Sequence, residues 1–474
     1  MATAKSLPDG ASAIEAWRAI ARANANLQRP VAALDAIDRA LRLDPDSAQS
    51  QLDRALVLEA DGRTDESCAA LESLVRAAPD SPQLLAHLAR ALRFAGRDAE
   101  AETRVVAGLE RWPLDVPLHR MLAEIRWQAG DGARSVARLE RAIAEFPGEL
   151  QLRLVAADLL RSAGALEPAL AQLEEGLRRA PGAAAFETSI GALLGDLGRP
   201  REALPFLRAA VQRLPGSAPM ARNLLPALVG AGEPAEALRI ADALLRGSPD
   251  DQQLIAWRAT ALRLLGDPAY DALVDHARLV RVFHLAPPPG YADIVAFNTA
   301  LTRELDALHR AERRPLAQSI RGGVQTERNL PARNPVIGEF FAALDAPLRD
   351  YVGRLDAKRA HPTDRRTLGG YRIAGSWSVR LAPGGFHTNH VHPQGWISSA
   401  YYVELPADDD ERAGWLKFGE ISPPVVGCGP DLYIRPQPGM LVLFPSFLWH
   451  GTVPFARGGR RLTAAFDVVP AAAT

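Results

Sequence analysis

The chain has 474 residues, and its 55 lysine and arginine residues nearly balance its 56 aspartate and glutamate residues. This balance gives no electrostatic basis for binding nucleic acid or an anionic membrane. Two distant cysteines, Cys68 and Cys428, argue against a disulfide framework and fit a reducing compartment. The N-terminus lacks the apolar core of a signal peptide, and no run of about eighteen apolar residues predicts a membrane span, so we expect a cytoplasmic protein.

Residues 12–266 repeat one pattern every 34 residues. Glycine recurs at positions 62, 96, 130, 164, 198, 232 and 266, and proline at positions 45, 79, 113, 147, 181, 215 and 249. Gln28 stands at the glycine position of the first repeat. Seven positions before the glycines lie the small residues Ala55, Ala89, Ala123, Ala157, Gly191 and Ala259, and Leu225 breaks this rule. Small residues let helices approach, glycine turns the chain and proline ends a helix, so the period predicts antiparallel helix pairs.

This pattern resembles the tetratricopeptide repeat. The resemblance implies seven full repeats, a further first helix near 250–265 and a capping helix over 268–283, all within an all-α domain over residues 12–283. Stacked repeats of this kind form a right-handed superhelix with a concave face. We expect this groove to bind a protein or a peptide, and the alternative is a scaffold without a ligand of its own.

The segment LAPPPGY at 285–291 ends the helical pattern and marks a domain boundary. We expect a helix over about 291–311, an irregular stretch over 318–330, and a second helix that Asn334 and Pro335 open and that ends near 354. From Gly370 the chain shows six short apolar runs: SWSVRLAP, WISSAYYVELP, GWLKFGE, LYIRP, MLVLFPS and RLTAAFDVV. Such runs predict a β-sandwich or jelly-roll barrel over 370–470, which with its helical lead-in (291–354) forms a second domain over 291–474.

The histidines of this domain indicate a metal site. His390 and His392 are two residues apart in a stretch that we expect to be extended, so both rings leave the same face, and His450 follows another apolar run. An open site of this kind suits a non-haem ferrous ion. A closed zinc site lacks a fourth nearby ligand, and packing alone would leave the rings in need of partners. A ligand set that includes His387 is a further alternative, and it needs a bulge at 388–389 because His387 and His390 otherwise face opposite ways.

Eleven and thirteen residues after His450, Arg461 and Thr463 share one strand face, whereas Arg460 points the other way and is expected at the surface. The pair would place a guanidinium and a hydroxyl where a dicarboxylate can be held. Trp377, Trp396 and Trp449 are candidates for the walls of a substrate cavity, and barrel core is the alternative for each.

Residues 370–470 resemble the double-stranded β-helix domain of iron(II)- and 2-oxoglutarate-dependent oxygenases, in the prolyl-hydroxylase-like branch. The motifs that carry the resemblance are H-x-H-P at 390–393, Y-Y-V at 401–403, F-P-S-x-x-x-H at 444–450 and R-L-T at 461–463.

The resemblance implies Fe(II), 2-oxoglutarate and dioxygen. It assigns His390, His392 and His450 as catalytic metal ligands, although His392 stands where the family usually has Asp or Glu, so the site has one negative charge fewer. Arg461 matches the residue that pairs with the distal carboxylate of 2-oxoglutarate, Thr463 matches the hydroxyl two residues on, and Tyr402 is a further candidate contact.

These assignments predict a dioxygenase that hydroxylates a protein or peptide bound by the repeats. The alternatives are an oxygenase for a small molecule whose repeats serve assembly, a repeat scaffold with a silent barrel, and a three-histidine dioxygenase that does not use 2-oxoglutarate.

Overall fold

The computed structural model describes residues 11–27, 29–132, 134–309, 316, 318–326, 329–367, 370–407 and 411–471. Gln28 therefore lies outside the described residues, as do parts of the stretch 318–330 and the end of the second domain. The chain divides into two compact units, Met1–Val155 and Ala156–Thr474. Each unit is described by itself.

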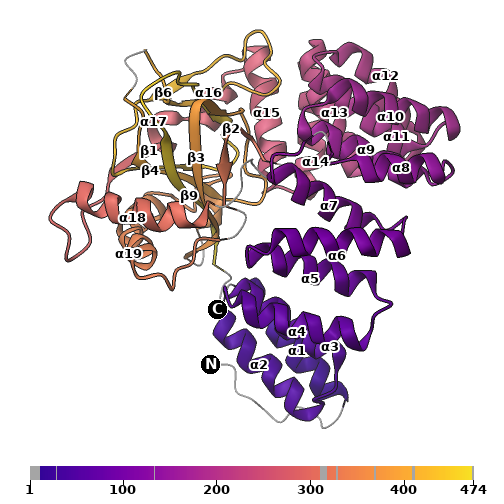
Figure 1. Cartoon of the computed structure of the whole chain (residues 1–474). Coiled ribbons are helices and arrows are strands. Elements are labelled where there is room, and N and C mark those ends of the chain that lie inside the picture. Colours follow the sequence, from indigo (N-terminus) through magenta and orange to yellow (C-terminus); the bar gives the residue numbers. More distant parts are fainter. Residues whose placement is uncertain are drawn as a thin grey trace. The chain divides into compact units, whose positions relative to one another are not determined.

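The first unit consists of paired helices (Figure 1). They are α1 (Ala11–Asn26), α2 (Pro30–Leu43), α3 (Ala48–Ala60), α4 (Thr64–Ala77), α5 (Pro82–Phe94), α6 (Asp98–Arg111), α7 (Val116–Gln128) and α8 (Ala137–Glu145). Helix α9 (Leu150–Ala163) begins in this unit and ends in the next. The alanine side chains at predicted positions such as Ala55 and Ala89 are completely buried between neighbouring helices.

The second unit begins with more helices of the same kind. They are α10 (Leu166–Arg179), α11 (Ala184–Asp196), α12 (Pro200–Arg213), α13 (Ala218–Ala231), α14 (Pro234–Gly247) and α15 (Gln252–Leu265). Within the described residues, α1–α14 form seven pairs and α15 is the further first helix, so the predicted helical array is confirmed. How the array curves, and hence the predicted superhelical groove, stays a prediction.

The periodic glycines, prolines and small residues have the structural roles that the sequence predicts. Every one of the seven periodic glycines has a positive φ, between 66° at Gly266 and 87° at Gly130 and Gly164, a conformation that other residues adopt at a cost. Each periodic proline directly follows the residue that caps a second helix, as Pro45 follows Asp44. At Gly191 a Cβ atom would lie 2.4 Å from Cγ of Leu207, so α11 and α12 are packed too closely there for any side chain.

The expected capping helix over 268–283 is wrong in part. Residues that follow α15 form two short helices, α16 (Ala269–Val274) and α17 (His276–Leu279), and then a strand, β1 (Arg281–His284). Strand β1 pairs antiparallel with Met440–Leu443 far along the chain, and that pairing, absent from any local pattern, makes this segment a strand.

Two further expectations for the lead-in need correction. Helix α18 (Ile294–Leu308) is present, but the stretch expected to be irregular contains β2 (Ile320–Gln325), which pairs with the following long strand. The second helix is two, α19 (Pro335–Ala343) and α20 (Asp345–Gly353). Asn334 caps α19 as predicted, because its side chain accepts a hydrogen bond from the Ile337 amide.

The six predicted strands are all present. They are β3 (Tyr371–His387), β4 (Ile397–Glu404), β5 (Leu416–Phe418), β6 (Leu432–Ile434), β7 (Met440–Pro445) and β9 (Arg461–Pro470). A further short strand, β8 (His450–Thr452), lies between β7 and β9, and a 3₁₀ turn at Asp364–Arg366 precedes β3. They form an antiparallel sheet of order β1-β7-β4-β9-β3-β2 and a smaller sheet of order β6-β5-β8. The β-rich domain is thus confirmed, and the jelly-roll arrangement stays a prediction.

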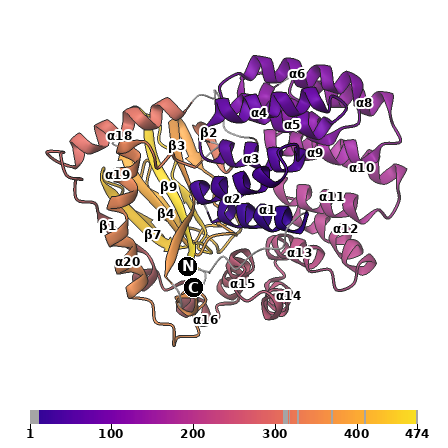
Figure 2. The same cartoon turned by 90° about the horizontal axis from the view of Figure 1, so that it is seen from below.

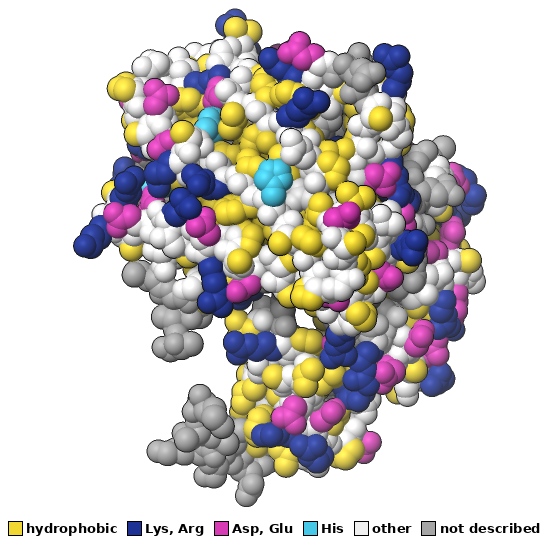
Figure 3. Space-filling model, turned by 90° about the vertical axis from the view of Figure 1, so that its left-hand side faces the viewer, with side chains coloured by type: hydrophobic (Ala, Val, Ile, Leu, Met, Phe, Trp, Pro, Cys, Tyr) yellow, Lys and Arg dark blue, Asp and Glu magenta, His cyan; other side chains and the backbone are white. Residues whose placement is uncertain are grey.

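The large sheet has one face for packing and one for the site. Helices α18–α20 lie along one side of the strands in Figure 2, and their apolar side chains share a core with alternate residues of β9 such as Leu462, Ala464 and Phe466. The intervening residues of β9 therefore face the other way. None of the described helices is long and apolar enough to cross a membrane. On the face drawn in Figure 3, acidic and basic side chains are interspersed around a concentration of hydrophobic side chains.

Candidate metal centre and cavity

Three histidines converge in the β-rich domain. One ring nitrogen from each of His390, His392 and His450 lies within 4.8 Å of the others, a spacing that can hold a metal ion. The ring centroids of His390 and His450 are 4.3 Å apart, and Nε2 of His390 is 3.1 Å from Nε2 of His392. The convergence that strand alternation predicts is present, and the metal that it binds stays a prediction.

The backbone brings these residues together in a way that alternation alone does not describe. Strand β3 ends at His387, so His390 and His392 do not lie on a regular strand. Instead, His390 and His450 exchange two backbone hydrogen bonds of 3.0 Å, and the His392 amide donates to the Ser446 carbonyl at 2.9 Å. Residues 390–392 are therefore anchored to both ends of the segment 446–450.

Each of the three rings is oriented by a hydrogen bond at Nδ1. The acceptors are the Thr388 carbonyl for His390 (2.8 Å), the Leu448 carbonyl for His450 (2.9 Å) and the Asp467 carboxylate for His392 (2.7 and 2.8 Å). Since an acceptor faces Nδ1 in every case, the proton belongs there and Nε2 keeps its lone pair. All three Nε2 atoms are thus prepared to be ligands.

Asp467 is the residue that sequence reasoning missed. Its carboxylate lies on the cavity side of β9, bonded to His392 and to the Ser398 hydroxyl, which donates to Oδ1 at 2.7 Å. The signal was available, because Arg461, Thr463 and Asp467 are separated by even numbers of residues on one strand. In the family that the sequence resembles, an Asp or Glu usually stands at the position of His392. Here the carboxylate of Asp467 instead accepts a hydrogen bond from Nδ1 of His392.

Burial keeps two of these histidines, His390 and His450, neutral. Desolvation, followed by the neighbouring His392, lowers the pKa of His390 to about 3. Burial and the adjacent His390 hold the pKa of His450 well below its ordinary value. Neutral imidazole is the form that binds a metal ion, so His390 and His450 need no deprotonation near neutral pH.

His387 lies next to this group without belonging to it. Its ring stacks on His390 at 5.8 Å, and its Nδ1 is 3.4 Å from the Ser319 hydroxyl. The group of converging ring nitrogens found among the described residues does not include it. His387 lines the same cavity and lies at the edge of the three-histidine group. The alternative ligand set that includes His387 therefore receives no geometric support.

Arg461 supplies a buried positive charge in the same cavity. Its side chain belongs to a residue that is only 2% exposed, and its Nε has no hydrogen-bond partner among the described residues. Burial lowers the pKa of this guanidinium below its ordinary value. A buried cation with an unused donor is costly, and an anionic ligand would satisfy it.

Thr463 and Tyr402 take different positions around Arg461. Thr463 lines the cavity two residues along the same strand face, as predicted. Tyr402 is completely buried and is not among the lining residues, and its ring faces the guanidinium with 5.0 Å between the ring centroid and Cζ of Arg461. Tyr402 therefore supports the arginine from behind.

The cavity has a volume of about 490 Å³. It is lined by the three converging histidines and Arg461, by the neutral polar residues Gln318, Ser319, Gln325 and Gln394, and by apolar residues that include Trp377, Val379 and Phe444. Of the three candidate tryptophans only Trp377 lines it; Trp396 is completely buried and donates to the Thr363 carbonyl at 2.8 Å. Trp449 points to helix α15 instead. Arg460 pairs with Glu404 and Asp306, away from the cavity.

Three imidazole rings whose arrangement could hold a metal ion and a buried guanidinium line one cavity between antiparallel sheets. The family model described as "Putative 2OG-Fe(II) oxygenase" matches residues 375–467, which contain all of these groups. Tetratricopeptide repeat models match residues 18–82, 52–116 and 126–191. The chain therefore carries tetratricopeptide repeats followed by a C-terminal domain of this oxygenase family. None of the curated proteins matches the sequence significantly.

Solved structures that resemble the chain include several repeat proteins. A tetratricopeptide repeat protein from Parabacteroides merdae has 11% identity and a TM-score of 0.35, over 53% of this chain and 99% of its own. A thermophilic repeat protein from Thermus thermophilus has 23% identity and a TM-score of 0.26, over 46% and 99%. The TPR2AB domain of yeast Sti1, solved in complex with pHSP90, has 16% identity and a TM-score of 0.23, over 53% of this chain and 99% of its own. These scores are too low to support any functional argument.

Proposed function

We propose that the protein is an iron(II)- and 2-oxoglutarate-dependent dioxygenase that hydroxylates a protein or peptide recruited by its repeats. The observation that carries the proposal is a single cavity that holds three preoriented Nε2 atoms and a buried guanidinium with an unused donor. Either feature alone would also suit a different kind of site, but together they fit one metal ion and one dicarboxylate.

The three histidines fit a ferrous ion. Three protein ligands on one side leave open coordination positions, which a catalytic site needs and a structural zinc site does not have. The carboxylate of Asp467 supports this fit, because it fixes the His392 tautomer and places a negative charge behind a neutral ligand. His390, His392 and His450 would therefore hold the ion.

Arg461 fits the distal carboxylate of 2-oxoglutarate. A guanidinium can grip a carboxylate through two parallel hydrogen bonds, and Thr463 adds a hydroxyl on the same strand face. Tyr402, the further candidate contact, would act through Arg461 by holding its guanidinium against the ring face. The cavity of about 490 Å³ leaves space beside a small dicarboxylate for a substrate side chain.

When bound, iron with 2-oxoglutarate and dioxygen supplies the oxidising power for hydroxylation. The chain itself supplies position and environment. The three imidazoles hold the ion through Nε2, Arg461 orients the co-substrate, and Trp377 and Phe444 help to exclude water from the cavity. His387 lies at the edge of the centre, where its ring can contact a bound ligand.

The repeats favour a macromolecular substrate, because extended repeat surfaces generally bind proteins or peptides. A small-molecule substrate, with the repeats used for assembly, is the second candidate, favoured by a cavity volume of about 490 Å³. The balanced net charge supports a protein partner over nucleic acid. Two buried free cysteines, Cys68 and Cys428, support a cytoplasmic location.

The first test is succinate production from 2-oxoglutarate by the full chain with ferrous iron and ascorbate. We expect slow turnover without substrate, which is lost in His450→Ala and strongly reduced in Arg461→Gln. Arg460→Gln is the matched control, because the neighbouring arginine forms ion pairs outside the cavity. If the wild-type protein binds no iron and shows no turnover, the result would favour the alternative of a repeat scaffold with a catalytically inactive barrel. Turnover of dioxygen that persists in Arg461→Gln and needs no 2-oxoglutarate would favour a three-histidine dioxygenase.

The substrate class needs a second test. The full-length His450→Ala variant serves as bait, and captured proteins are then incubated with wild-type enzyme, ferrous iron and 2-oxoglutarate. A captured protein that gains one oxygen atom in wild-type but not in variant reactions supports the protein substrate. Stimulated succinate production by small metabolites alone, with no oxidised protein, would favour the second candidate.

A further inference from the structure

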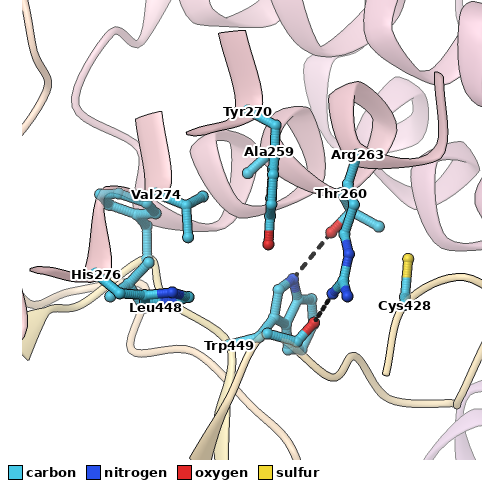
Figure 4. Close-up of a pocket in the computed structure, with 11 residues that line it drawn as sticks. Ala259, Thr260, Arg263, Tyr270, Val274, His276, Cys428, Leu448 and Trp449 are labelled. Carbon is cyan, nitrogen blue, oxygen red and sulfur yellow. Dashed lines mark hydrogen bonds between the residues drawn. The ribbon is translucent and has the colours of Figure 1, made fainter. Parts of the chain in front are cut away.

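Helix α15, the last helix of the repeat array, contacts the residue directly before His450. The indole of Trp449 donates from Nε1 to the Thr260 hydroxyl at 3.2 Å, and its ring packs against Trp257 with 5.1 Å between centroids. Figure 4 shows Trp449 directed at Thr260 on the helix. The side chain next to a candidate ligand is therefore held by the array, although the two segments are 189 residues apart.

The same helix also holds the backbone at this point. Arg263 donates from one guanidinium nitrogen to the carbonyls of Gly419 (3.0 Å) and Gly429 (2.8 Å), and it forms an ion pair with Asp431. The Gly419 amide in turn donates to the Trp449 carbonyl at 2.9 Å. Arg263 is thus two hydrogen bonds from the backbone of Trp449, and Figure 4 shows its contact with the β-rich domain beside that of Thr260.

Gly419 occupies a position in this contact that favours glycine. Its φ is 89°, and a Cβ atom there would lie 2.5 Å from a carboxylate oxygen of Asp431. The residue before it, Phe418, pairs with His450 in the small sheet. A change in Arg263 therefore reaches His450 by two routes, through Trp449 and through the pairing of β5 with β8.

The apolar core continues across the same contact. Ile255, Ala256, Ala259 and Leu262 of α15 share one buried cluster with Phe418, Phe444, Phe447 and Leu448 of the β-rich domain. Phe444 lies 4.7 Å from the His450 ring, centroid to centroid. By its packing, α15 belongs to the β-rich domain as much as to the repeats.

We propose that α15 is a positioning element of the metal centre, in which Thr260 and Arg263 hold the Trp449–His450 segment so that Nε2 of His450 faces the other two ligands. This inference rests on the proposed metal site. Metal affinity depends on ligand placement, and groups that orient a ligand typically contribute about 10–100-fold to it. A partner that moves α15 when it binds to the repeats would change the metal centre through these contacts.

The test uses the full chain and titration with Co(II) under anaerobic conditions. Thr260→Val removes the acceptor for Trp449 at nearly constant shape, and Arg263→Met removes the three polar contacts and keeps the side-chain stem. We expect about tenfold weaker Co(II) binding in each, with altered Co(II) absorption bands that report changed ligand geometry. Arg263→Lys keeps a charge for Asp431 and should recover part of the affinity.

Arg258→Met is the matched control on the same helix. Arg258 pairs with Asp242 of α14, within the array, so its loss should leave Co(II) affinity and spectrum unchanged. Variants that melt at a lower temperature but bind Co(II) as the wild type does, with the same spectrum, would overturn the inference. If Arg263→Met does not fold, the isosteric Thr260→Val decides. A wild-type protein that binds no Co(II), Zn(II) or Fe(II) would instead overturn the proposed function.

Discussion

The structure of the repeat array is determined by residues that are close together in the sequence, whereas the β-rich domain depends on contacts between residues that are far apart in the sequence. In the array, a glycine with positive φ and a proline after each helix cap act on their own neighbours, so one 34-residue unit explains the others. In the β-rich domain, the His392 ring depends on a carboxylate 75 residues away and the Trp449 indole on a hydroxyl 189 residues away. Changes in the array outside α15 should therefore act locally, whereas changes in α15 or in the β-rich domain should act at the site.

The largest expected effect is that of removing a ligand. His450→Ala deletes one of three converging Nε2 atoms and should weaken Fe(II) or Co(II) binding by more than about 100-fold, beyond the range for outer-sphere residues. Equilibrium dialysis measures this directly. His361→Ala is a control histidine, which bonds to the Leu273 carbonyl and lies outside the cavity. Equal metal binding by wild type and His450→Ala would remove this histidine from the site.

The next effect separates co-substrate binding from metal binding. Arg461→Gln should raise the KM for 2-oxoglutarate by roughly 10–100-fold, since a hydrogen bond to a charged group contributes about 1.5–3 kcal/mol. Co(II) affinity without 2-oxoglutarate should stay near the wild-type value, because no converging ring nitrogen is changed. A KM that does not change would show that the anion binds elsewhere.

Replacement of Asp467 should weaken metal binding less than the loss of a ligand does. Asp467→Asn keeps an acceptor for His392 but removes the charge, and we expect about tenfold weaker Co(II) binding. His392→Asp would place a second carboxylate against Asp467 and should bind metal poorly, whereas the double variant His392→Asp/Asp467→Asn should recover it, because like charges no longer meet. Co(II) titration of the three variants compares them, and an Asp467→Asn protein with wild-type affinity contradicts the role.

A matched pair of glycines tests the local character of the array. Gly191→Ala should destabilise the fold by about 1–3 kcal/mol, because the new methyl group overlaps Leu207. Gly195→Ala on the same helix meets nothing within 4 Å and should stabilise it by up to about 1 kcal/mol. Urea unfolding gives both values. Metal affinity should change in neither variant, and a loss of Co(II) binding in Gly191→Ala would refute the separation of the two regions.

The smallest effect concerns pH. Burial, and then Arg380, lower the pKa of His309 from 6.5 to about 4. The folded state therefore resists protonation that the unfolded state accepts, so this stabilisation is complete above pH 6.5 and is lost as the pH falls toward 4. Its slope is at most about 1.4 kcal/mol per pH unit. Urea unfolding at pH 7 and 5.5 should show a smaller acid loss for His309→Gln than for wild type, and equal losses would contradict it.

Prediction from the sequence succeeded where a signal is periodic or local. The helix pairs follow from glycine and proline spacing, and the convergence of His390, His392 and His450 follows from strand alternation and one motif. Strands β1 and β2 were missed, because each is short and is fixed by a partner strand far along the chain. The contacts of α15 were missed for the same reason, whereas Asp467 could have been found, because it lies on the same strand face as Arg461 and Thr463. A hydrogen bond between distant segments leaves no pattern in either one.

Because α15 shares a buried core with the β-rich domain, the number of repeats can change among the helices before α15 but not at α15 itself. Repeats are units that duplicate or disappear as blocks, and an insertion or deletion among α1–α14 leaves the contacts of Thr260 with Trp449 and of Arg263 with Gly419 in place. Replacement of α15 by another first helix would instead separate the array from His450. Descendants of this chain can therefore differ in repeat number at the far end, while the helix against the β-rich domain is inherited together with the metal ligands.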